Sequence, residues 1–532
     1  MKPTRPPAAS VAEHYRRIGA WRDVPVGHHL ARAAALWPEA LAVVDGDRRL
    51  TFADIARETE AVAAGLHARG VGPGDVVSFQ LPNRAEAVVL FQAIMRLGAV
   101  ANPIVPIYRG RELRFILGQA RTTVAVVPGE YRGVDYPELY ASLRADLPDL
   151  RHVVSLDDWE ELRGDPVAVP ATDPDPDSVC LLLYTSGTTA DPKGALHSHN
   201  TLLFENRSMV EAFGLNERDV VFNPSPVTHI TGVNCALTLP FLTGGPVVLM
   251  DRWDPAEALA SITAEGATYM IFSTPFLSGL VAEAEKAQVD TPSIRYIVCG
   301  GADIPDELAR RAGRLGVITR MYGATEGPSV TASNRWDDVA VRTRSDGIPI
   351  APTQVRVDER GEVLWRGPDT CLGYLDDTLN EAAFTEDGWF RTGDLARFDA
   401  DGAIHIVGRI KDIVNRSGEK ISTYEVENLL GEHPAVAEVA VVAGPDPRTG
   451  ERGCAFVVTA PGATLTLDEV TAHLRAREVA VQKIPESLFL VDVLPRTASG
   501  KIQKFALRAW VSDRDTVPQQ MAGTTVRASE ER

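Results

Sequence analysis

The stretch LLLYTSGTTADPKG, residues 181–194, constrains the fold and the chemistry of this chain more than any other segment. Its leucines and tyrosine are typical of the end of a buried strand. The loop that follows is rich in Gly, Ser and Thr and ends at Lys193, so it offers N–H groups, hydroxyls and a positive charge that suit a polyphosphate. It is not a P-loop, because Pro192 precedes the lysine and Gly194 follows it. A surface turn without a ligand is the alternative for a loop of this composition.

Composition narrows the class of protein. A chain of 532 residues is too long for one ordinary core, and 45% hydrophobic with 24% charged residues is typical of a globular protein. The net charge of −18 argues against nucleic acid or an anionic membrane as the main partner. The most apolar stretch, 233–250, is interrupted by prolines and glycines, so we expect no membrane span.

Cysteine usage and the N-terminus point to a cytoplasmic protein. The five cysteines lie far apart without a CxxC pair, which predicts buried free thiols in a reducing compartment. The proline-rich start, MKPTRPPAAS, lacks the apolar segment of a secretory signal.

Helical and strand-like patterns alternate along most of the chain, as in α/β layers with parallel strands. Short strands with turns over 355–365 and 403–407 predict a small β-barrel-like segment. Beyond Gly408, about a hundred residues have an alternation of their own, enough for a small α+β domain. We expect an α/β fold: a large, multi-layered N-terminal domain of mostly parallel sheets over 1–408 and a small, mobile C-terminal α+β domain over 409–532.

The string YTSGTTADPKG closely resembles the phosphate-binding signature of the adenylate-forming superfamily, which includes acyl-CoA synthetases, peptide-synthetase adenylation domains and luciferases. Five signatures of that superfamily occur in its order, and the resemblance covers residues 30 to about 510. It implies that ATP phosphates bind at this loop, with Thr185 also near Mg²⁺. The residues assigned to the phosphates are Thr185, Ser186, Gly187, Thr188, Thr189 and Lys193.

The string YGATE, residues 322–326, is similar to the superfamily's YGxTE. A lone Thr-Glu is more often a helix start, with Thr as the cap and Glu at the N-terminal dipole. The resemblance implies instead that Tyr322 and Gly323 lie by the adenine, Thr325 contacts the α-phosphate and acyl oxygen, and Glu326 binds Mg²⁺.

A glycine-rich segment upstream of that string matches the superfamily's GGA. Such glycines also occur in a simple tight turn. The resemblance assigns Gly301 and Ala302 to the adenine pocket.

The sequence RTGD, 391–394, matches the superfamily's TGD, although a single aspartate in a turn is usually a turn residue. The resemblance assigns Asp394 to the ribose hydroxyls and Arg409 to the support of the same ribose. Lys411 then occupies the position of the hinge residue, and hinges absorb large backbone changes.

Two segments beyond the hinge resemble the parts that complete the chemistry. SGEKIS, 417–422, resembles the glycine loop that lines the pantetheine tunnel of CoA, with Gly418 allowing close approach. PRTASGKIQK, 495–504, resembles the last signature, which implies that Lys501 reaches the α-phosphate and carboxylate during adenylation. The C-terminal domain would then rotate away to admit the thiol.

The acid substrate is constrained by SPVTHITGVN, 225–234, which lacks the carboxylate that holds an α-ammonium in peptide-synthetase domains. PVTHITG instead resembles the acyl-CoA synthetase pattern, with His229 beside the carboxylate pocket, although a structural histidine is the plainer alternative. The residues expected to line an apolar acyl pocket are Val227, Ile230, Val233, Phe272, Pro275 and Ala324.

We therefore expect an ATP- and Mg²⁺-dependent ligase that joins a medium-chain, alicyclic or aryl acid to CoA. Three alternatives stay open: transfer to a carrier protein, adenylation of an unusual acid such as nitrite for aryl amine diazotisation, and a catalytically silent nucleotide-binding homologue. The joint presence of Glu326, Asp394 and Lys501 argues against the silent homologue. Dimers are common in the superfamily, so a homodimer is compatible with the sequence.

Overall fold

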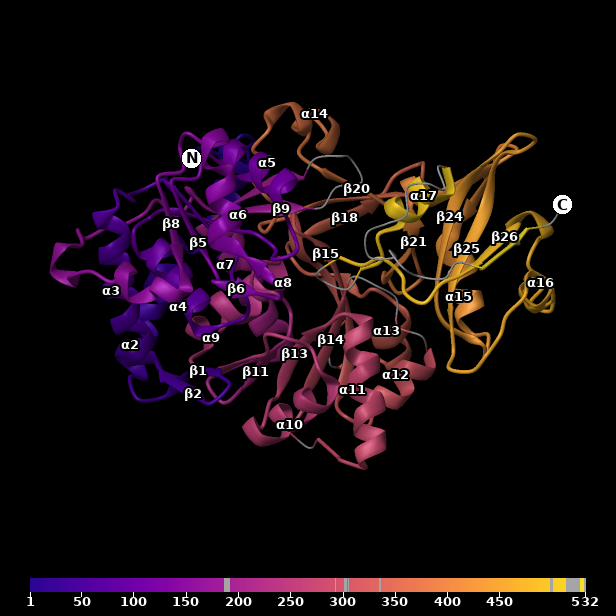
Figure 1. Ribbon diagram of the computed structural model, residues 1–532, viewed down its shortest axis with the longest axis horizontal. Helices are drawn as coiled ribbons and strands as arrows, with labels where there is room; N and C mark the ends of the chain where they lie inside the picture. Colours follow the sequence, from indigo (N-terminus) through magenta and orange to yellow (C-terminus); the bar gives the residue numbers. More distant parts are fainter. Residues whose placement is uncertain are drawn as a thin grey trace. The chain divides into compact units, whose positions relative to one another are not determined.

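The computed structural model describes residues 1–185, 192–291, 293–300, 304, 306–333, 336–497, 501–512 and 527–530. The chain divides into two compact units, each with its own sheets (Figure 1). The larger unit comprises Met1–Val355 and Trp365–Phe390, and the smaller unit comprises Arg356–Leu364 and Arg391–Arg532.

The first sheet of the larger unit has nine strands in the order β17-β16-β15-β14-β13-β11-β12-β1-β2. The run from β15 to β1 is parallel, and β2, β16 and β17 are added by antiparallel pairing. Its strands are β1 (Leu41–Asp45), β2 (Arg48–Thr51), β11 (Val221–Asn223), β12 (Val247–Leu249), β13 (Tyr269–Phe272), β14 (Tyr296–Gly300), β15 (Val317–Ala324), β16 (Gly327–Ala332) and β17 (Ile348–Pro349).

The second sheet has six strands in the order β10-β9-β4-β3-β5-β8, and only β10 is antiparallel to its neighbour. Its strands are β3 (Val76–Phe79), β4 (Val100–Pro103), β5 (Val124–Val127), β8 (His152–Ser155), β9 (Val179–Thr185) and β10 (Lys193–Ser198). Every residue of β3, β4 and β5 is buried, as expected for parallel strands covered on both faces.

Helix α4 (Ala85–Arg96) lies between the two sheets, because it contacts both β1 and β4. Its residues from Ala87 to Met95 are all buried, and a helix that is apolar on every side belongs in a core. On the other face of the nine-stranded sheet, α10 (Pro255–Glu265), α11 (Thr274–Ala287) and α12 (Asp306–Ala312) line up beside β13 and β14 (Figure 1). The sheets are therefore covered by helices in layers.

The remaining elements of the larger unit are further helices and one short hairpin. They are α1 (Ala9–Arg17), α2 (Gly27–Leu36), α3 (Phe52–Ala68), α5 (Gly110–Ala120), the hairpin β6 (Glu130–Tyr131) and β7 (Val134–Asp135), α6 (Tyr136–Leu143), η1 (Arg144–Asp146), η2 (Leu156–Leu162), η3 (Pro166–Ala168), α7 (His199–Phe213), α8 (Ile230–Gly232), η4 (Val233–Thr238), α9 (Leu239–Thr243), α13 (Val339–Arg344), η5 (Asp377–Leu379) and α14 (Asn380–Ala383).

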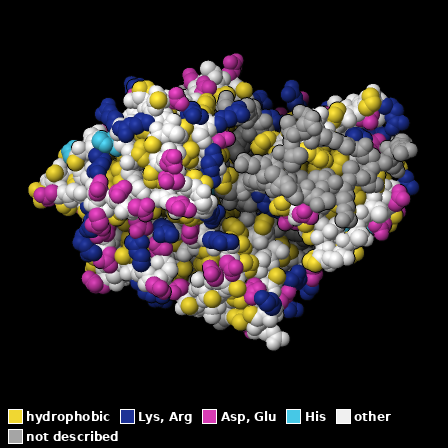
Figure 2. Space-filling model, in the orientation of Figure 1, with side chains coloured by type: hydrophobic (Ala, Val, Ile, Leu, Met, Phe, Trp, Pro, Cys, Tyr) yellow, Lys and Arg dark blue, Asp and Glu magenta, His cyan; other side chains and the backbone are white. Residues whose placement is uncertain are grey.

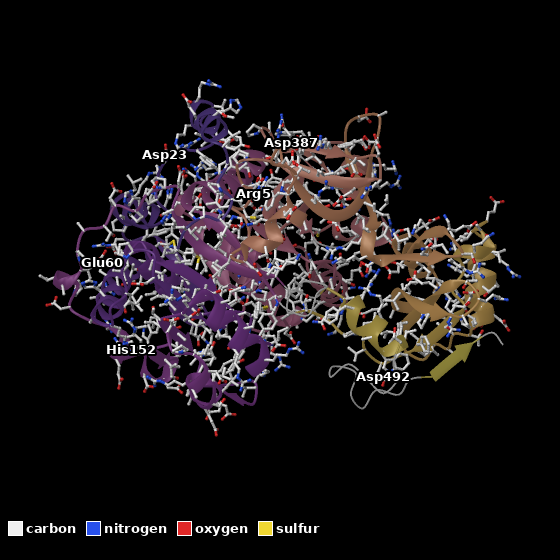
Figure 3. All side chains as sticks on the ribbon, turned by 90° about the horizontal axis from the view of Figure 1, so that it is seen from above. Arg5, Asp23, Glu60, His152, Asp387 and Asp492 are labelled. Carbon is white, nitrogen blue, oxygen red and sulfur yellow. The ribbon has the colours of Figure 1, made fainter. Side chains whose placement is uncertain are left out.

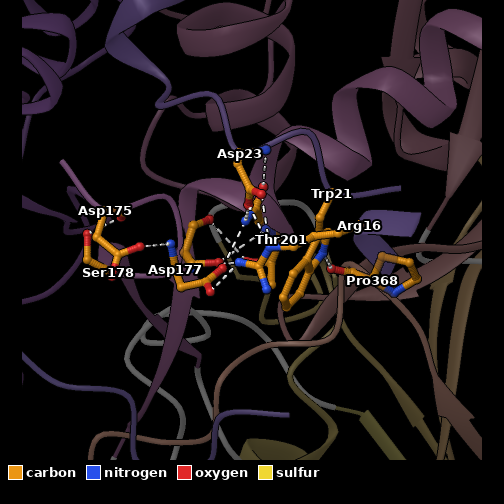
Figure 4. Close-up of polar contacts among 10 residues, drawn as sticks. Arg16, Trp21, Asp23, Asp175, Asp177, Ser178, Thr201 and Pro368 are labelled. Atoms are coloured by element: carbon orange, nitrogen blue, oxygen red, sulfur yellow. Dashed lines mark hydrogen bonds and ion pairs between the residues drawn. The ribbon is translucent and has the colours of Figure 1, made fainter. Parts of the chain in front are cut away.

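The N-terminal arm, residues 1–25, is tied to the rest of the larger unit by several side chains. Arg16 binds the carboxylates of Asp23 and Asp177, and the indole of Trp21 donates to the Pro368 carbonyl over 3.0 Å (Figure 4). Arg5 lies beside the segment that carries Asp387 in Figure 3, and its guanidinium donates to the Thr385 carbonyl over 2.6 Å. The arm is thus part of the packed structure, not a loose extension.

The smaller unit is built on a six-stranded mixed sheet in which β24 (Val436–Asp446) pairs with β25 (Gly450–Thr459). Alternate residues of the two strands enter different cores, since Val441 and Ala455 pack in one cluster and Val442 and Cys454 in another. Helices α15 (Thr423–Gly431) and α16 (Leu467–Arg475) contribute to the first cluster, and α17 (Lys504–Ser512) to the second.

The other elements around that sheet complete the smaller unit. They are η6 (Ile410–Asp412), β22 (Ile413–Arg416), β23 (Glu419–Ser422), η7 (Val481–Lys483), β26 (Ser487–Leu490) and β27 (Arg527–Glu530). A separate four-stranded sheet has the order β18 (Gln354–Val357), β19 (Glu362–Arg366), β20 (Phe390–Phe398) and β21 (Ile404–Arg409). This sheet is formed by the segment predicted to be barrel-like.

The architecture confirms the predicted fold class: a large α/β region with mostly parallel sheets and a smaller C-terminal α+β region. The boundary at 408/409 stays a prediction, because a division into compact units does not by itself locate a hinge.

Within the described residues, no helix is long and apolar enough to cross a membrane. Figure 2 shows basic and acidic side chains interspersed over the visible face of the larger unit. All five cysteines are buried and free, as expected.

Candidate active site

The predicted phosphate loop joins two neighbouring antiparallel strands. Thr185 is the last residue of β9 and Lys193 the first of β10, and the two are paired in register. The pairing brings the two described ends of the loop together at one edge of the six-stranded sheet. Ser186, Gly187, Thr188 and Thr189 lie outside the described residues.

The YGATE string ends one strand and enters a hairpin. Strand β15 ends at Ala324 and β16 begins at Gly327, so Thr325 and Glu326 form the turn between them. The helix-start alternative for this Thr-Glu pair is therefore wrong. A Cβ on Gly323 would lie 2.1 Å from the Pro328 carbonyl oxygen, so the close approach of the two strands requires glycine there.

Three contacts hold the turn at Thr325 and Glu326. The Nε2 of His197, on β10, lies 2.7 Å from the Thr325 carbonyl oxygen, and the Cys371 N–H donates to the Glu326 carbonyl oxygen over 2.7 Å. The Tyr374 hydroxyl donates to Oε1 of Glu326 over 2.5 Å. Burial lowers the pKa of His197 to about 4, so the ring is neutral and its Nε2 carries the proton that the carbonyl accepts.

Tyr374 links the turn to the phosphate loop. Lys193 Nζ lies 5.3 Å from the centroid of the Tyr374 ring, the geometry of a cation–π contact. Burial and the neighbouring Glu326 carboxylate raise the pKa of Tyr374, so its hydroxyl remains a donor. Residues on both sides of Tyr374 bond to β10, since Leu372 N–H donates to Leu196 O and Leu375 N–H to Gly194 O, each over 2.7 Å. The sequence analysis missed this tyrosine, because nothing in CLGYLDD distinguishes it from a core aromatic residue.

The structure describes only some of the residues predicted to form the adenine pocket. Tyr322 packs against Trp365, with ring centroids 6.0 Å apart and planes at 80°. Gly301 and Ala302 lie outside the described residues, so their assignment stays a prediction.

His229 caps the helical segment that follows β11. Its Nδ1 accepts from the Thr231 N–H over 3.3 Å, and α8, the π-helix η4 and α9 follow without a break. Pro240 cannot donate a backbone hydrogen bond, which accounts for the irregular turns before it. Of the expected apolar lining, Val227, Ile230, Val233 and Phe272 are buried. π-turns inside helices occur frequently at functional sites.

In the smaller unit, Asp394 and Arg409 are cross-strand partners. They are paired in the β20–β21 ladder, and Arg409 Nε lies 2.9 Å from Asp394 Oδ1. The Asp394 side chain is mostly buried, whereas Arg409 is exposed. The ladder therefore brings together the two residues assigned to the ribose, with a carboxylate oxygen already oriented by the guanidinium.

Gly418 lies at the tip of a two-residue hairpin loop. Arg416 and Glu419 pair across β22 and β23, and the two residues between them have positive φ, 52° at Ser417 and 90° at Gly418. This pattern is that of a type I′ turn, in which both central residues take left-handed conformations. The turn is exposed, and strand β22 separates it from η6, which contains Lys411.

Lys501 is placed next to a backbone bridge of the smaller unit. Its N–H donates to Thr497 Oγ1 over 3.1 Å, its carbonyl accepts from the Thr497 N–H over 2.8 Å, and Arg496 bridges Ile502. These contacts fix the backbone on both sides of the residue. The residue is partly exposed.

The described side chains fit Mg²⁺ brought by a nucleotide better than a permanently bound metal. Among the residues described, no group of three or more His, Cys, Asp or Glu side chains could hold a metal ion. Mg²⁺ is usually bound through one or two carboxylates together with substrate phosphates and water. Glu326 offers one such carboxylate, and the Thr185 hydroxyl lies at the end of the neighbouring β9.

Comparison with known proteins agrees with this geometry. Residues 30–375 match the family model described as AMP-binding enzyme, and residues 425–501 match that of the AMP-binding enzyme C-terminal domain. The chain belongs to the AMP-binding enzyme family. The medium-chain fatty-acid–CoA ligase of Escherichia coli K12 is 35% identical to it, over 93% of this chain and 92% of the relative.

Further relatives of the AMP-binding enzyme family act on aryl acids. The salicylyl-CoA synthase / salicylate adenylyltransferase of a Streptomyces species is 36% identical, over 93% of this chain and 95% of the relative. The crystal structure of the anthranilate CoA ligase AuaEII with anthranoyl-AMP superposes with a TM-score of 0.83 at 27% identity, covering 92% of this chain and 97% of that one. The predicted superfamily is thus confirmed.

The chemistry of the AMP-binding enzyme family follows for this chain. It is an AMP-forming acid–thiol ligase that activates a carboxylic acid with ATP as an acyl-adenylate and then forms the CoA thioester. ATP, Mg²⁺ and CoA are its small-molecule ligands.

Proposed function

We propose that the ATP phosphates bind where β9, β10 and the Glu326 turn meet. The contacts of Tyr374 with both Lys193 and Glu326 are the observation that carries this proposal. The Lys193 ammonium lies over the face of the Tyr374 ring, and the Glu326 carboxylate accepts from the hydroxyl of the same ring. In this proposal Lys193 and the Thr185 end of the loop receive the phosphates, Glu326 binds the Mg²⁺ that accompanies them, and Thr325 contacts the α-phosphate.

The ribose and the adenine of ATP are assigned to two further sets of residues. We assign the ribose hydroxyls to Asp394, because a carboxylate oriented by Arg409 can accept from two vicinal hydroxyls. The adenine is assigned to Tyr322, Gly323, Gly301 and Ala302 by resemblance to the superfamily.

We propose that a C-terminal domain, residues 409–532, moves about a hinge near Lys411. In one orientation Lys501 stabilises the charge that develops as the acid attacks the α-phosphate and pyrophosphate leaves. In the other, the Gly418 loop lines the path of the CoA thiol to the acyl carbon. The turn at Ser417 and Gly418 supports this role, because its exposed backbone carries only a small side chain at the tip.

The acid is proposed to be medium-chain, alicyclic or aryl, with its carboxylate beside His229. The segment 225–234 has no acidic residue to bind an α-ammonium, and its Val227, Ile230 and Val233 are buried. Relatives named for medium-chain fatty acids and for salicylate lie in the same range of identity. These observations support an apolar acid without an α-amino group.

The acceptor of the acyl group, the oligomeric state and the cellular compartment are also proposals. We take free CoA as the acceptor, with a carrier-protein pantetheine as the alternative, and a homodimer as compatible with the fold. The five buried free thiols support a reducing cytoplasmic setting.

A panel of carboxylic acids tests the proposal. Pyrophosphate release is measured with MgATP and each acid, with and without CoA, and the products are identified by mass. We expect release with apolar acids and an acyl-CoA product when CoA is present. Release only with nitrite, or only with α-amino acids, would overturn the proposed substrate class, and acyl transfer only to a carrier protein would overturn the proposed acceptor.

A further inference from the structure

The segment that carries Tyr374 runs along β10 inside the larger unit. Tyr374 lies opposite Ala195 in an antiparallel bridge, and its neighbours Leu372 and Leu375 donate their N–H groups to β10. Because backbone groups alternate in direction along an extended chain, the N–H and carbonyl of Tyr374 point away from β10. These two groups therefore need hydrogen-bond partners on the outer edge of the segment.

The side chains of Thr4 and Asn380 supply both partners. Thr4 Oγ1 donates to the Tyr374 carbonyl over 2.7 Å, and the Tyr374 N–H donates to Asn380 Oδ1 over 2.8 Å. The two side chains also bond to each other, since Asn380 Nδ2 donates to Thr4 Oγ1 over 3.2 Å. Asn380 is buried at the start of α14, whereas Thr4 is half-buried in the N-terminal arm. The backbone of Tyr374 is thus held by a residue that lies 370 positions away in the sequence.

Arg5 fixes the N-terminal arm beside Thr4. Its N–H donates to the Leu372 carbonyl over 2.8 Å, and its guanidinium donates to the Thr385 carbonyl over 2.6 Å. The guanidinium carbon also lies 5.0 Å from the centroid of the Phe384 ring, which is a cation–π distance. These contacts keep the hydroxyl of Thr4 where it can bond to the segment along β10.

The ring of Tyr374 faces the proposed phosphate site while its backbone is held by the arm. Its hydroxyl donates to Glu326 Oε1 over 2.5 Å, and the Lys193 ammonium lies 5.3 Å from the ring centroid. A tyrosine side chain is rigid and has only two rotatable bonds, so the position of its backbone determines where the hydroxyl lies. Hydrogen bonds to charged groups are short, and they weaken when distance and angle change. The bond to Glu326 therefore depends on the groups that hold the Tyr374 backbone.

We propose that Thr4 and Asn380 are positioning residues for MgATP binding, acting through the backbone of Tyr374. They keep the hydroxyl of that tyrosine on Glu326 and its ring under Lys193. The inference rests on the proposed phosphate and Mg²⁺ site, and it adds the N-terminal arm to the parts of the chain that set the affinity for MgATP. A purely structural role of the arm is the competing interpretation.

Equilibrium binding of MgATP to the full chain, measured by calorimetry without any acid, tests the inference. Thr4→Val keeps the shape of the side chain and removes its hydroxyl, so the Kd for MgATP should rise about fivefold, the net effect of one hydrogen bond. The Kd for ATP in EDTA should rise less than about twofold, because the tyrosine acts through the carboxylate proposed to bind Mg²⁺. Thr4→Ser retains the hydroxyl and should bind MgATP within about twofold of the native chain.

Thr123→Val is the matched control. It removes another half-buried threonine hydroxyl, which donates to the Val76 carbonyl over 3.1 Å, and it should leave both Kd values unchanged. Arg5→Met removes the guanidinium contacts that hold the arm and should raise the Kd for MgATP in the same direction as Thr4→Val. The Arg5 variant keeps the inference testable if Thr4→Val does not fold.

A double variant separates positioning from structure. In a Tyr374→Phe background, Thr4→Val should raise the Kd for MgATP less than about twofold further, because the hydroxyl that it positions is absent. A full additional effect, or equal weakening of ATP binding with and without Mg²⁺, would assign Thr4 to the structure and overturn the inference.

Tyr374→Phe alone distinguishes the inference from the proposed site on which it rests. If Tyr374→Phe weakens MgATP binding but Thr4→Val does not, the inference falls and the proposed phosphate site stands. If Tyr374→Phe leaves MgATP binding unchanged, the proposed Mg²⁺ site at Glu326 falls, and the inference falls with it.

Discussion

The hydroxyl of Tyr374 donates a 2.5 Å hydrogen bond to Oε1 of Glu326, the carboxylate proposed to bind Mg²⁺. The same ring lies under the Lys193 ammonium, and its neighbours in the chain bond to β10. The tyrosine thus contacts both a carboxylate and a cation that are proposed to act on one nucleotide. Its role is that of a positioning residue, because it acts through Glu326 and Lys193.

Tyr374→Phe should weaken the use of MgATP. The substitution leaves the Glu326 carboxylate without its oriented donor, so we expect kcat/KM for MgATP in pyrophosphate release to fall about tenfold, equivalent to about 1.4 kcal/mol. The dependence on Mg²⁺ concentration should shift to higher values, whereas KM for the acid should stay nearly constant. Tyr140→Phe is the matched control, because it removes another buried tyrosine hydroxyl, which bonds Gln80 over 3.2 Å. Equal effects of the two variants would contradict the positioning role.

Lys501→Ala should separate the two half-reactions. Removing the ammonium should lower adenylate formation at least about 100-fold, since the charge developing at phosphorus loses its counter-charge. Thioester formation from preformed acyl-adenylate and CoA should change less than about threefold. Lys483→Ala is the control, because it removes only an exposed ion pair with Glu425. Parallel loss of both half-reactions would show that Lys501 is not specific to adenylation.

Lys411→Pro should impair the other half-reaction, thioester formation. Proline fixes φ near −65°, so a hinge at this position could no longer change its backbone conformation. We expect adenylation to be retained and thioester formation to fall at least about tenfold in single-turnover measurements. Lys411→Ala should retain both half-reactions, because it leaves the backbone free. A proline variant that supports both half-reactions at the native rate would remove the hinge from this residue.

The buried carboxyls should make stability depend on pH. Glu205 keeps its proton in the folded chain up to a pKa of about 8, whereas its ordinary pKa is 4.5. The folded state therefore binds more protons than the unfolded state between these values, and the free energy of unfolding should fall as pH rises through that window. Asp369, with a pKa raised to about 7, acts in the same direction.

Denaturant midpoints at pH 5.5 and pH 8 measure this dependence. The midpoint should be lower at pH 8 for the native chain, and Glu205→Gln should show a smaller decrease because an amide does not titrate. Glu160→Gln, which changes a carboxylate of an exposed ion pair, should keep the native dependence. A native chain that is more stable at pH 8 than at pH 5.5 would show that other groups dominate.

Much of the fold could be predicted because its elements carry local signals. The alternation of strand-like and helical patterns is such a signal, and the structure forms strands over 76–79 and 269–272 and a helix over 255–265. The helical pattern that begins at Leu467 gives a helix that ends at Arg475, shortly before Glu478, which takes a left-handed conformation with φ 58°. Periodicity locates an element well, whereas its last turn depends on the backbone beyond it.

The candidate site was predictable where a motif carries it and hidden where only tertiary packing does. Asp394 and Arg409 lie fifteen residues apart, yet they became partners because they share a ladder position. Tyr374 and Glu205 carry no motif, and their partners Glu326 and Ser329 are distant in sequence. A buried carboxyl inside an otherwise ordinary helix gives no signal that sequence patterns can detect.

Isotope transfer from the acid to AMP tests the central claim most directly. A carboxylic acid labelled with ¹⁸O in both carboxyl oxygens is converted with MgATP and CoA, and the AMP is examined by mass spectrometry. If the carboxylate attacks the α-phosphate and the thiol then attacks the acyl carbon, one carboxyl oxygen leaves with the nucleotide, so the AMP should carry one ¹⁸O. Acyl-CoA formed together with unlabelled AMP would contradict an acyl-adenylate route.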